Sequence, residues 1–182
     1  MLLYLTDCER LEEIRVIALR NQKLTICLKM LSKCDNLSIV YLQHNMISLK
    51  DMNHLHTFAN IKKLDLSDNQ LEALPQASVF AGMKSLLFLY LHNNQISKWQ
   101  DLQSLTALPS IMHITLFANP VCSIPGYRHF VVNSIPGLKA LDNFVITDEE
   151  RIEDASFGYR FRGLNEFMKL HIPDYTHEKS AE

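Results

Sequence analysis

Residues 86–96 read LLFLYLHNNQI, and this stretch decides the fold. Leu89 and Leu91 alternate with Tyr90, as expected for a short strand that buries one face. Asn94 follows where the chain must turn away, and its amide can both donate to and accept from backbone groups that the turn leaves unpaired. The stretch therefore predicts a short, half-buried strand that ends in an asparagine-stabilised turn.

The same pattern recurs along the chain. The template, apolar-x-x-apolar-x-apolar-x-x-Asn-x-apolar, also begins at Leu37, Ile61 and Ile111, and a weaker copy begins at Ile14 with Gln22 in the place of the asparagine. Successive Asn or Gln positions (22, 45, 69, 94 and 119) lie 23 to 25 residues apart. A unit this short cannot bury its leucines alone, so neighbouring units must stack.

The repeat predicts an α/β architecture, a right-handed solenoid with a parallel concave sheet. We expect strands near residues 16–18, 40–42, 64–66, 89–91 and 114–116, in sequence order, beside a ladder of asparagines. Between the strands, apolar residues lie three or four positions apart, as Trp99, Leu102 and Leu105 do. This spacing indicates short helices or 3₁₀ turns on the convex side.

The composition agrees with a leucine framework, and the net charge excludes some classes of binding partner. Of the 182 residues, 28 are leucine and only 5 are glycine, and the net charge is -2. Nucleic acids and anionic membranes usually select an excess of positive charge, so we expect neither as the main partner. No apolar run reaches the roughly 18 residues of a membrane helix. The opening Met1-Leu-Leu-Tyr-Leu5 lacks a basic region and stops at Asp7, so we expect no signal peptide.

Side chains that could carry chemistry are scattered. His44, His92 and His113 belong to different repeats, and no Gly-rich phosphate loop exists. The four cysteines form no CxxC pair, which favours reduced thiols in the cytoplasm, with Cys34 and Cys122 as small buried hydrophobes. We therefore expect no catalytic residues, no cofactor and no metal site, and a protein that is not an enzyme.

The template is that of the leucine-rich repeat. The short period resembles the class of the protein-phosphatase-1 regulatory subunit and the outer-arm dynein light chain. After the last repeat, the chain resembles the cap of that class, which is also found in the A-prime protein of a spliceosomal ribonucleoprotein. The residues that carry this resemblance are Tyr127, Arg128, Val131, Val132, Ile135, Pro136, Leu138, Leu141 and Asp142. The resemblance implies that Tyr127 and Val131 shield the last strand, and that Arg128 pairs with backbone carbonyls or with Asp142.

The C-terminal half is similar to leucine-rich repeat and IQ domain-containing proteins. The similarity lies in residues 126–129, 132–135, 138–142 and 145–150. No IQ motif is present, so a calmodulin site is not carried over to this chain. The family context implies a cilium or a flagellar axoneme.

These patterns divide the chain into four parts. We expect an N-terminal capping segment over residues 1–13, five repeats over 14–121, a cap over 122–146, and a helix and tail over 147–182. Thr147 and Glu150 form a capping box, which predicts a helix start near residue 148, and Thr6 and Glu9 suggest a short helix before the first repeat. The apolar stretch 157–170 either packs back on the cap or docks to a partner.

The concave face is the candidate binding site. In each strand the residues between the framework positions project to the concave side, in three rows that cross the sheet. The rows bring aromatic residues onto a surface that ought to be wet, and aromatic residues concentrate interface energy. The predicted protein-binding residues are Tyr41, Asp65, Phe88, Tyr90, His92 and Phe117. Asp65 is expected to select a basic residue on the partner.

The sequence favours a non-catalytic scaffold or adaptor. Its expected partner is a protein segment such as an amphipathic helix, or an axonemal or microtubule-associated component. The alternatives are a regulatory subunit that targets a phosphatase or a dynein motor, and a component of an RNA-associated ribonucleoprotein. Sparse basic residues on the concave rows, Arg20 and Lys63, weigh against the last.

Overall fold

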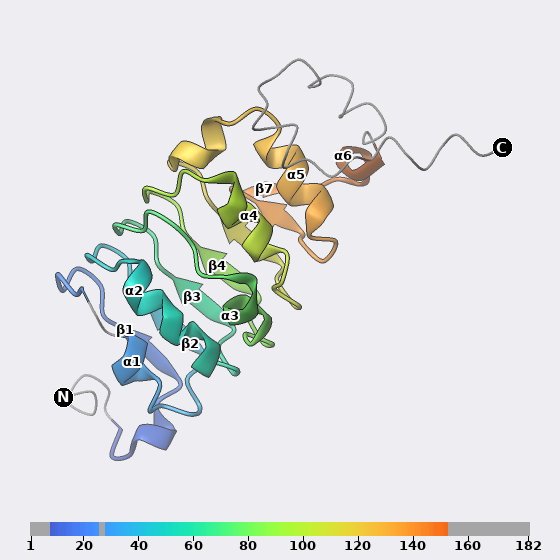
Figure 1. Cartoon of the computed structure of the whole chain (residues 1–182). Helices are drawn as coiled ribbons and strands as arrows, with labels where there is room; N and C mark the ends of the chain where they lie inside the picture. The colour runs from blue at the N-terminus through green and yellow to red at the C-terminus, as the bar shows by residue number, and fades with distance from the viewer. Residues whose placement is uncertain (1–7, 26–27, 153–182) are drawn as a thin grey trace.

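The computed structural model describes residues 8–25 and 28–152 of the chain. Its centre is one sheet whose strands follow each other in sequence order (Figure 1). Neighbouring strands from β1 to β6 are parallel, and β6 and β7 are antiparallel. The strands are β1 (Val16–Ala18), β2 (Ile39–Tyr41), β3 (Lys63–Asp65), β4 (Phe88–Tyr90), β5 (His113–Thr115), β6 (Ala140–Leu141) and β7 (Phe144–Val145). The predicted order and direction are confirmed, and the five predicted strands lie within one residue of those observed.

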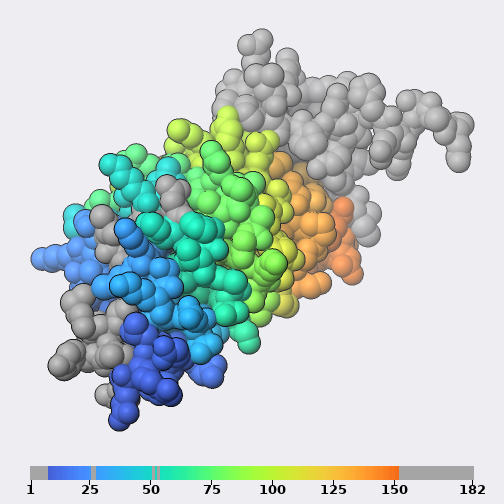
Figure 2. Space-filling model, turned by 60° about the horizontal axis from the view of Figure 1, so that its bottom comes forward, coloured from blue at the N-terminus to red at the C-terminus, as the bar shows by residue number. Residues whose placement is uncertain are grey.

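Short helices follow the strands as the chain returns along the other side. They stack in the same order as the strands, and in the space-filling view the colours run in sequence order along the body (Figures 1 and 2). The helical elements before the last strand pair are η2 (Leu11–Glu13), α1 (Leu28–Leu31), α2 (Leu49–Met52), η3 (Asn53–Thr57), α3 (Ala77–Ala81), α4 (Trp99–Leu105), η4 (Pro120–Ser123) and α5 (Tyr127–Ser134). The fold class is therefore an α/β solenoid, as predicted.

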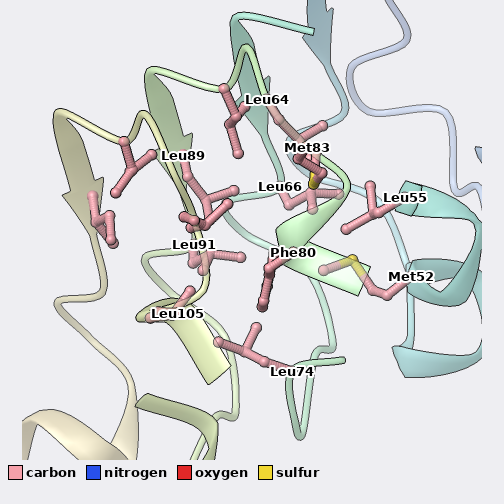
Figure 3. Packing of buried hydrophobic residues seen from close by; sticks show 14 of the residues in the cluster. Met52, Leu55, Leu64, Leu66, Leu74, Phe80, Met83, Leu89, Leu91 and Leu105 are labelled. Atoms are coloured by element: carbon pink, nitrogen blue, oxygen red, sulfur yellow. The ribbon is translucent and has the colours of Figure 1, made fainter. Parts of the chain in front are cut away.

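The core lies between the sheet and these helices. Leu64 and Leu89 point inward from their strands toward Phe80 and Leu105 on the helices (Figure 3). All four side chains are fully buried. Full burial of such a side chain stabilises the fold by about 1.5–3 kcal/mol, so the leucine framework supplies the main driving force for stacking.

An asparagine ladder closes the turns after the strands. The Asn69 amide nitrogen donates to the carbonyls of Leu42 (3.0 Å) and Leu66 (3.1 Å), and its oxygen accepts from the Ile47 N–H (3.0 Å). One side chain thus ties two successive repeats together. The equivalent bonds are made by Asn45, Asn94 and Asn119.

Gln22 does not join the ladder, which corrects the first repeat of the prediction. Its side chain is exposed and donates to the Arg20 carbonyl at 3.0 Å. No strand precedes β1 among the described residues, so an amide at this position has no earlier turn to bridge. The ladder begins at Asn45, whose oxygen accepts from the Gln22 N–H at 3.0 Å.

The C-terminal cap continues the ladder with different residues. The Asp142 carboxylate accepts from the backbone N–H groups of Leu116 (2.6 Å) and Phe117 (2.8 Å) and from the Tyr127 hydroxyl (2.8 Å). Tyr127 and Val131 of α5 are buried, as the resemblance implies. Burial, with the nearby Asp142 charge, raises the pKa of Tyr127 far above its usual value, so the hydroxyl stays a donor.

Arg128 pairs with a backbone carbonyl, as the resemblance implies, but its carboxylate partner is Glu150 and not Asp142. It donates to the Leu141 carbonyl at 3.1 Å, but its ion pair is with Glu150, at 2.6 and 2.9 Å, and not with Asp142. Glu150 belongs to α6 (Asp148–Ile152), and its capping box with Thr147 is present as predicted, with both bonds at 3.3 Å. The same carboxylate therefore starts α6 and fastens it to α5.

Both chain ends carry predictions that the structure leaves untested. The first turn, η2, is fastened by Arg10 and Glu13, whereas Thr6 lies outside the described residues. The apolar stretch 157–170 also lies outside them. Within the described ranges, no helix has the length and apolar character to span a membrane.

Candidate protein-binding face

The sheet aligns three rows of side chains across the strands. The register pairs Ile39 with Lys63 and Lys63 with Phe88, and it pairs Tyr41 with Asp65 and Asp65 with Tyr90. Residues two positions beyond the second row form the third, which includes His92 and Phe117. We call these rows on strands β1 to β5 the concave face. It contains Val16, Ala18, Arg20, Ile39, Tyr41, Gln43, Lys63, Asp65, Ser67, Phe88, Tyr90, His92, His113, Thr115 and Phe117.

An aromatic cluster occupies the end of this face nearest the cap. The Tyr90 and His113 rings meet edge to face with centroids 5.4 Å apart, and Phe88 meets His113 at 6.4 Å. His92 stacks on Phe117 with centroids 4.4 Å apart and ring planes 13° from parallel. The His92 Nδ1 also lies 2.8 Å from the Thr115 hydroxyl, which fixes the ring. Four predicted residues, Phe88, Tyr90, His92 and Phe117, therefore form one ordered patch.

Two cations adjoin tyrosines at the other end. The Arg20 guanidinium lies 4.3 Å from the centre of the Tyr41 ring. The Lys63 ammonium lies 4.9 Å from the ring centres of both Tyr41 and Tyr90, so it bridges the two tyrosines that flank Asp65 in the second row. Sequence reasoning treated Lys63 only as a sparse basic residue. The signal that could have found it is the repeat register, which places residue 63 between two aromatic repeats.

Asp65 is less available than predicted. Only 9% of it is exposed, and its Oδ1 accepts from the Ser67 N–H (3.1 Å) and hydroxyl (2.7 Å). The carboxylate therefore stabilises a local turn by accepting these two hydrogen bonds. This corrects the expectation that Asp65 stands open to a basic residue on a partner.

Two buried polar atoms of the concave face are unsatisfied. Among the described side chains, His113 Nε2 in the aromatic cluster and Gln43 Oε1, which follows β2 in the third row, are buried without a hydrogen-bond partner. Burial lowers the pKa of His113, and the nearby Lys63 charge lowers it further while Asp142 opposes this effect. The imidazole is thus held neutral, and it acts as an aromatic ring in the cluster.

The exposed surface of the rows is mixed aromatic and apolar. Phe117 is 38% exposed and Val16 is 50% exposed, while Tyr41, Phe88 and Tyr90 are partly exposed. By contrast, the largest apolar residues of the helices, such as Trp99 and Phe80, are buried. A polar groove lies beyond the ladder, with Lys50, Glu72 and Lys98 in its lining. The concave face is therefore the richer surface in aromatic contacts.

The described residues, 8–25 and 28–152, contain no candidate metal-binding cluster. No group of three His, Cys, Asp or Glu side chains in these ranges could hold a metal ion. Cys34 is buried as predicted, whereas Cys122 is half-buried and its thiol donates to the Leu116 carbonyl at 2.9 Å. Burial raises the pKa of both thiols, which makes them poor nucleophiles.

Comparison with known proteins places this geometry in a family. The family model described as leucine-rich repeat matches residues 6–169. The chain belongs to the leucine-rich repeat family. The predicted resemblance to the IQ domain-containing members is also confirmed, because the chain is 39% identical over 135 residues to leucine-rich repeat and IQ domain-containing protein 3 of Homo sapiens. That match covers 74% of this chain and 21% of the relative, so the chain spans about a fifth of the relative's length.

Two further comparisons bear on the leucine-rich repeat fold. Leucine-rich repeat-containing protein 51 of Bos taurus is 31% identical over 118 residues, with 62% of this chain and 60% of the relative covered. A chain in the crystal structure of the Drosophila melanogaster SNF/U2A' complex has a TM-score of 0.68. That chain is 22% identical, with 85% of each chain covered, so the likeness concerns the fold alone.

Proposed function

We propose that this leucine-rich repeat chain is a non-catalytic scaffold that binds a protein segment through its concave face. The observation that carries the proposal is the aromatic patch of Phe88, Tyr90, His92 and Phe117, which ring contacts hold in a fixed arrangement. Aromatic side chains supply large contact areas and lose few rotamers, so such a patch gives affinity at a small entropic penalty.

The repeat architecture supports this role. Strands β2 to β5 each contribute side chains to the face, and the ladder fixes the spacing between them. The face is therefore organised before a partner arrives, which reduces the ordering cost of binding. An amphipathic helix that lies across the strands can contact several repeats at once.

The wider setting of this function is also a proposal. The resemblance to IQ domain-containing relatives and to the dynein light chain favours a ciliary or axonemal assembly in the cytoplasm. A regulatory subunit that targets a phosphatase or a dynein motor is the alternative, since it would use the same face for a different partner.

Cross-linking mass spectrometry on the intact protein tests the binding face. Complexes recovered from ciliated tissue would be treated with a lysine-reactive reagent. The chain offers Lys63 on the concave face and Lys98 at the start of α4 as a matched pair. We expect partner cross-links at Lys63 and its neighbour Lys62. Partner cross-links confined to Lys50 and Lys98 would move the site to the polar groove and contradict the proposal.

A further inference from the structure

We propose that the concave face selects an acidic segment, whose carboxylates pair with Lys63 and Arg20 while its apolar residues cover Phe88 and Phe117. This inference rests on the proposed function and adds the chemistry of the partner. The sequence predicts from Asp65 that the partner carries a basic residue, whereas this inference requires acidic residues on the partner.

The two cations of the face have no acidic partner in the described part of the chain. The ion pairs found there join Arg10 to Glu13 and Arg128 to Glu150, and His44 lies 3.7 Å from Asp68. The charged groups of Lys63 and Arg20 lie over tyrosine rings instead. A cation over an aromatic face is stabilised by about 0.5–2 kcal/mol, which leaves the charge free to attract an anion.

Asp65 is the one carboxylate within the rows, and it leaves the positive charge of Lys63 and Arg20 available to a partner. Asp65 is buried, and Ser67 donates two hydrogen bonds to it. A partner that approaches the strands therefore meets the ammonium and the guanidinium before it meets the carboxylate. Charge complementarity favours acidic residues at this end of the face.

Tyr41 limits the distance between the two charges, because both lie close to its ring. The Arg20 and Lys63 charged groups lie 4.3 and 4.9 Å from its ring centre. They are thus at most about 9 Å apart, a span that two carboxylates can reach from positions three or four apart on one helix. The tyrosine rings also restrict the long cationic side chains before binding, which lowers the entropy lost when an ion pair forms.

The face is asymmetric, which gives the segment a direction. Its cations lie over β1 to β3, and its aromatic cluster lies over β4 and β5. A fitting helix carries an acidic pair in one turn and apolar residues in a following turn. Apolar neighbours exclude water around the ion pairs, and charged groups attract more strongly where the local dielectric constant is low.

A nucleic acid fits this arrangement less well, although phosphates are also anionic. Binding of a nucleic acid usually neutralises several phosphates, and the described rows supply only Arg20 and Lys63 as permanent cations. The aromatic rings are also packed edge to face against one another around His113, and this leaves fewer open ring faces for bases.

A displayed library of helical peptides tests the inference directly. The full chain would be the bait, and the exposed positions of the peptides would vary among acidic, basic, apolar and neutral polar residues. We expect enriched peptides to carry two acidic residues three or four positions apart beside apolar residues. Lys63→Met should weaken the best peptide at least about tenfold, and Lys63→Glu should shift the enrichment toward basic residues.

The controls separate this inference from the proposed function. Lys62→Met removes an exposed charge one residue before β3 and should leave peptide affinity unchanged. A second outcome is that the enriched peptides lose affinity in Tyr90→Ala and yet show no excess of acidic residues and no loss of affinity in Lys63→Met. That result would overturn the charge preference but not the proposed function. Peptides that bind independently of Tyr90 and Phe117 would overturn both proposals. A single-stranded RNA that displaces the peptides with greater affinity, and depends on Lys63, would overturn the protein partner. Thermal melts would confirm that each variant is folded.

Discussion

The asparagine ladder makes a quantitative prediction at Asn69. In Asn69→Ala the carbonyls of Leu42 and Leu66 each keep a second amide donor, from Asn45 (2.8 Å) and Asn94 (3.0 Å). The buried Ile47 N–H, by contrast, loses the acceptor that Asn69 provided at 3.0 Å. One buried donor left without a partner costs about 1–3 kcal/mol, so we expect the free energy of unfolding to fall by that amount and not by the sum of all the bonds lost.

Asp68→Ala is the matched control at the neighbouring position. Asp68 has a backbone φ of 53°, and Ala118 adopts 56° at the equivalent place one residue before a ladder asparagine, so alanine is compatible with this conformation. The change removes an exposed bond from Asn93 and a contact of 3.7 Å with His44. Such surface interactions contribute about 0–1 kcal/mol.

Urea unfolding of the full chain measures both variants. We expect the midpoint to fall clearly for Asn69→Ala and little for Asp68→Ala, with similar slopes, because the slope follows the surface exposed on unfolding. Equal losses in the two variants would refute the assignment of Asn69 to a buried ladder.

Three other predictions concern the cap and pH. Deletion of residues 122–146 bares β5 and should cause aggregation in light-scattering measurements; a soluble truncation that melts cooperatively would show that the cap is dispensable. The hydrogen bonds of Arg128 lower the pKa of Glu150 below its usual 4.5, so the pair stabilises the fold above about pH 4.5 and this contribution is lost as the pH falls. The free energy of unfolding of Glu150→Gln should therefore be lower than that of the wild type at pH 7, and the difference should shrink in acid. A difference that stays constant with pH would count against the ion pair. Burial lowers the pKa of His113 below 6.5, so stability should decline as the pH falls through 6.5, and chemical unfolding should show a smaller decline in His113→Gln.

The sequence was sufficient for the framework of the fold. Leu64, Leu89 and Ile114 are buried at the strand centres because the template alternates, and the constant period places equivalent residues side by side. The ladder was predictable for the same reason, since each asparagine meets the backbone of the preceding repeat. The predicted place of Gln22 in the ladder was wrong, because the template does not show whether another repeat precedes the one that contains Gln22.

The details of the candidate site needed side-chain geometry. Alternation alone predicts that Asp65 is exposed, but Ser67, two residues later, donates two hydrogen bonds to its carboxylate, and the side chain is buried. Lys63 is long enough to reach two tyrosines from different strands, and a row assignment does not specify where such a side chain ends. Likewise Glu150 was predicted as a helix cap, whereas its pairing with Arg128 depends on how α6 meets α5.

Tyr90 is proposed as a binding residue that lies outside the core. Its ring is partly exposed and contacts Lys63 and His113 on the concave face. The most direct measurement compares partner affinity and melting temperature for Tyr90→Ala and for Lys98→Ala, an exposed position on the helix side. Tyr90→Ala should weaken partner binding by about 2 kcal/mol or more, in the range of interface anchors, with the melting temperature nearly unchanged. Lys98→Ala should change neither quantity. Unfolding of Tyr90→Ala would show that the ring belongs to the core, and a hydrogen-exchange footprint of the partner wholly on the convex side would show that the concave face is not the binding site.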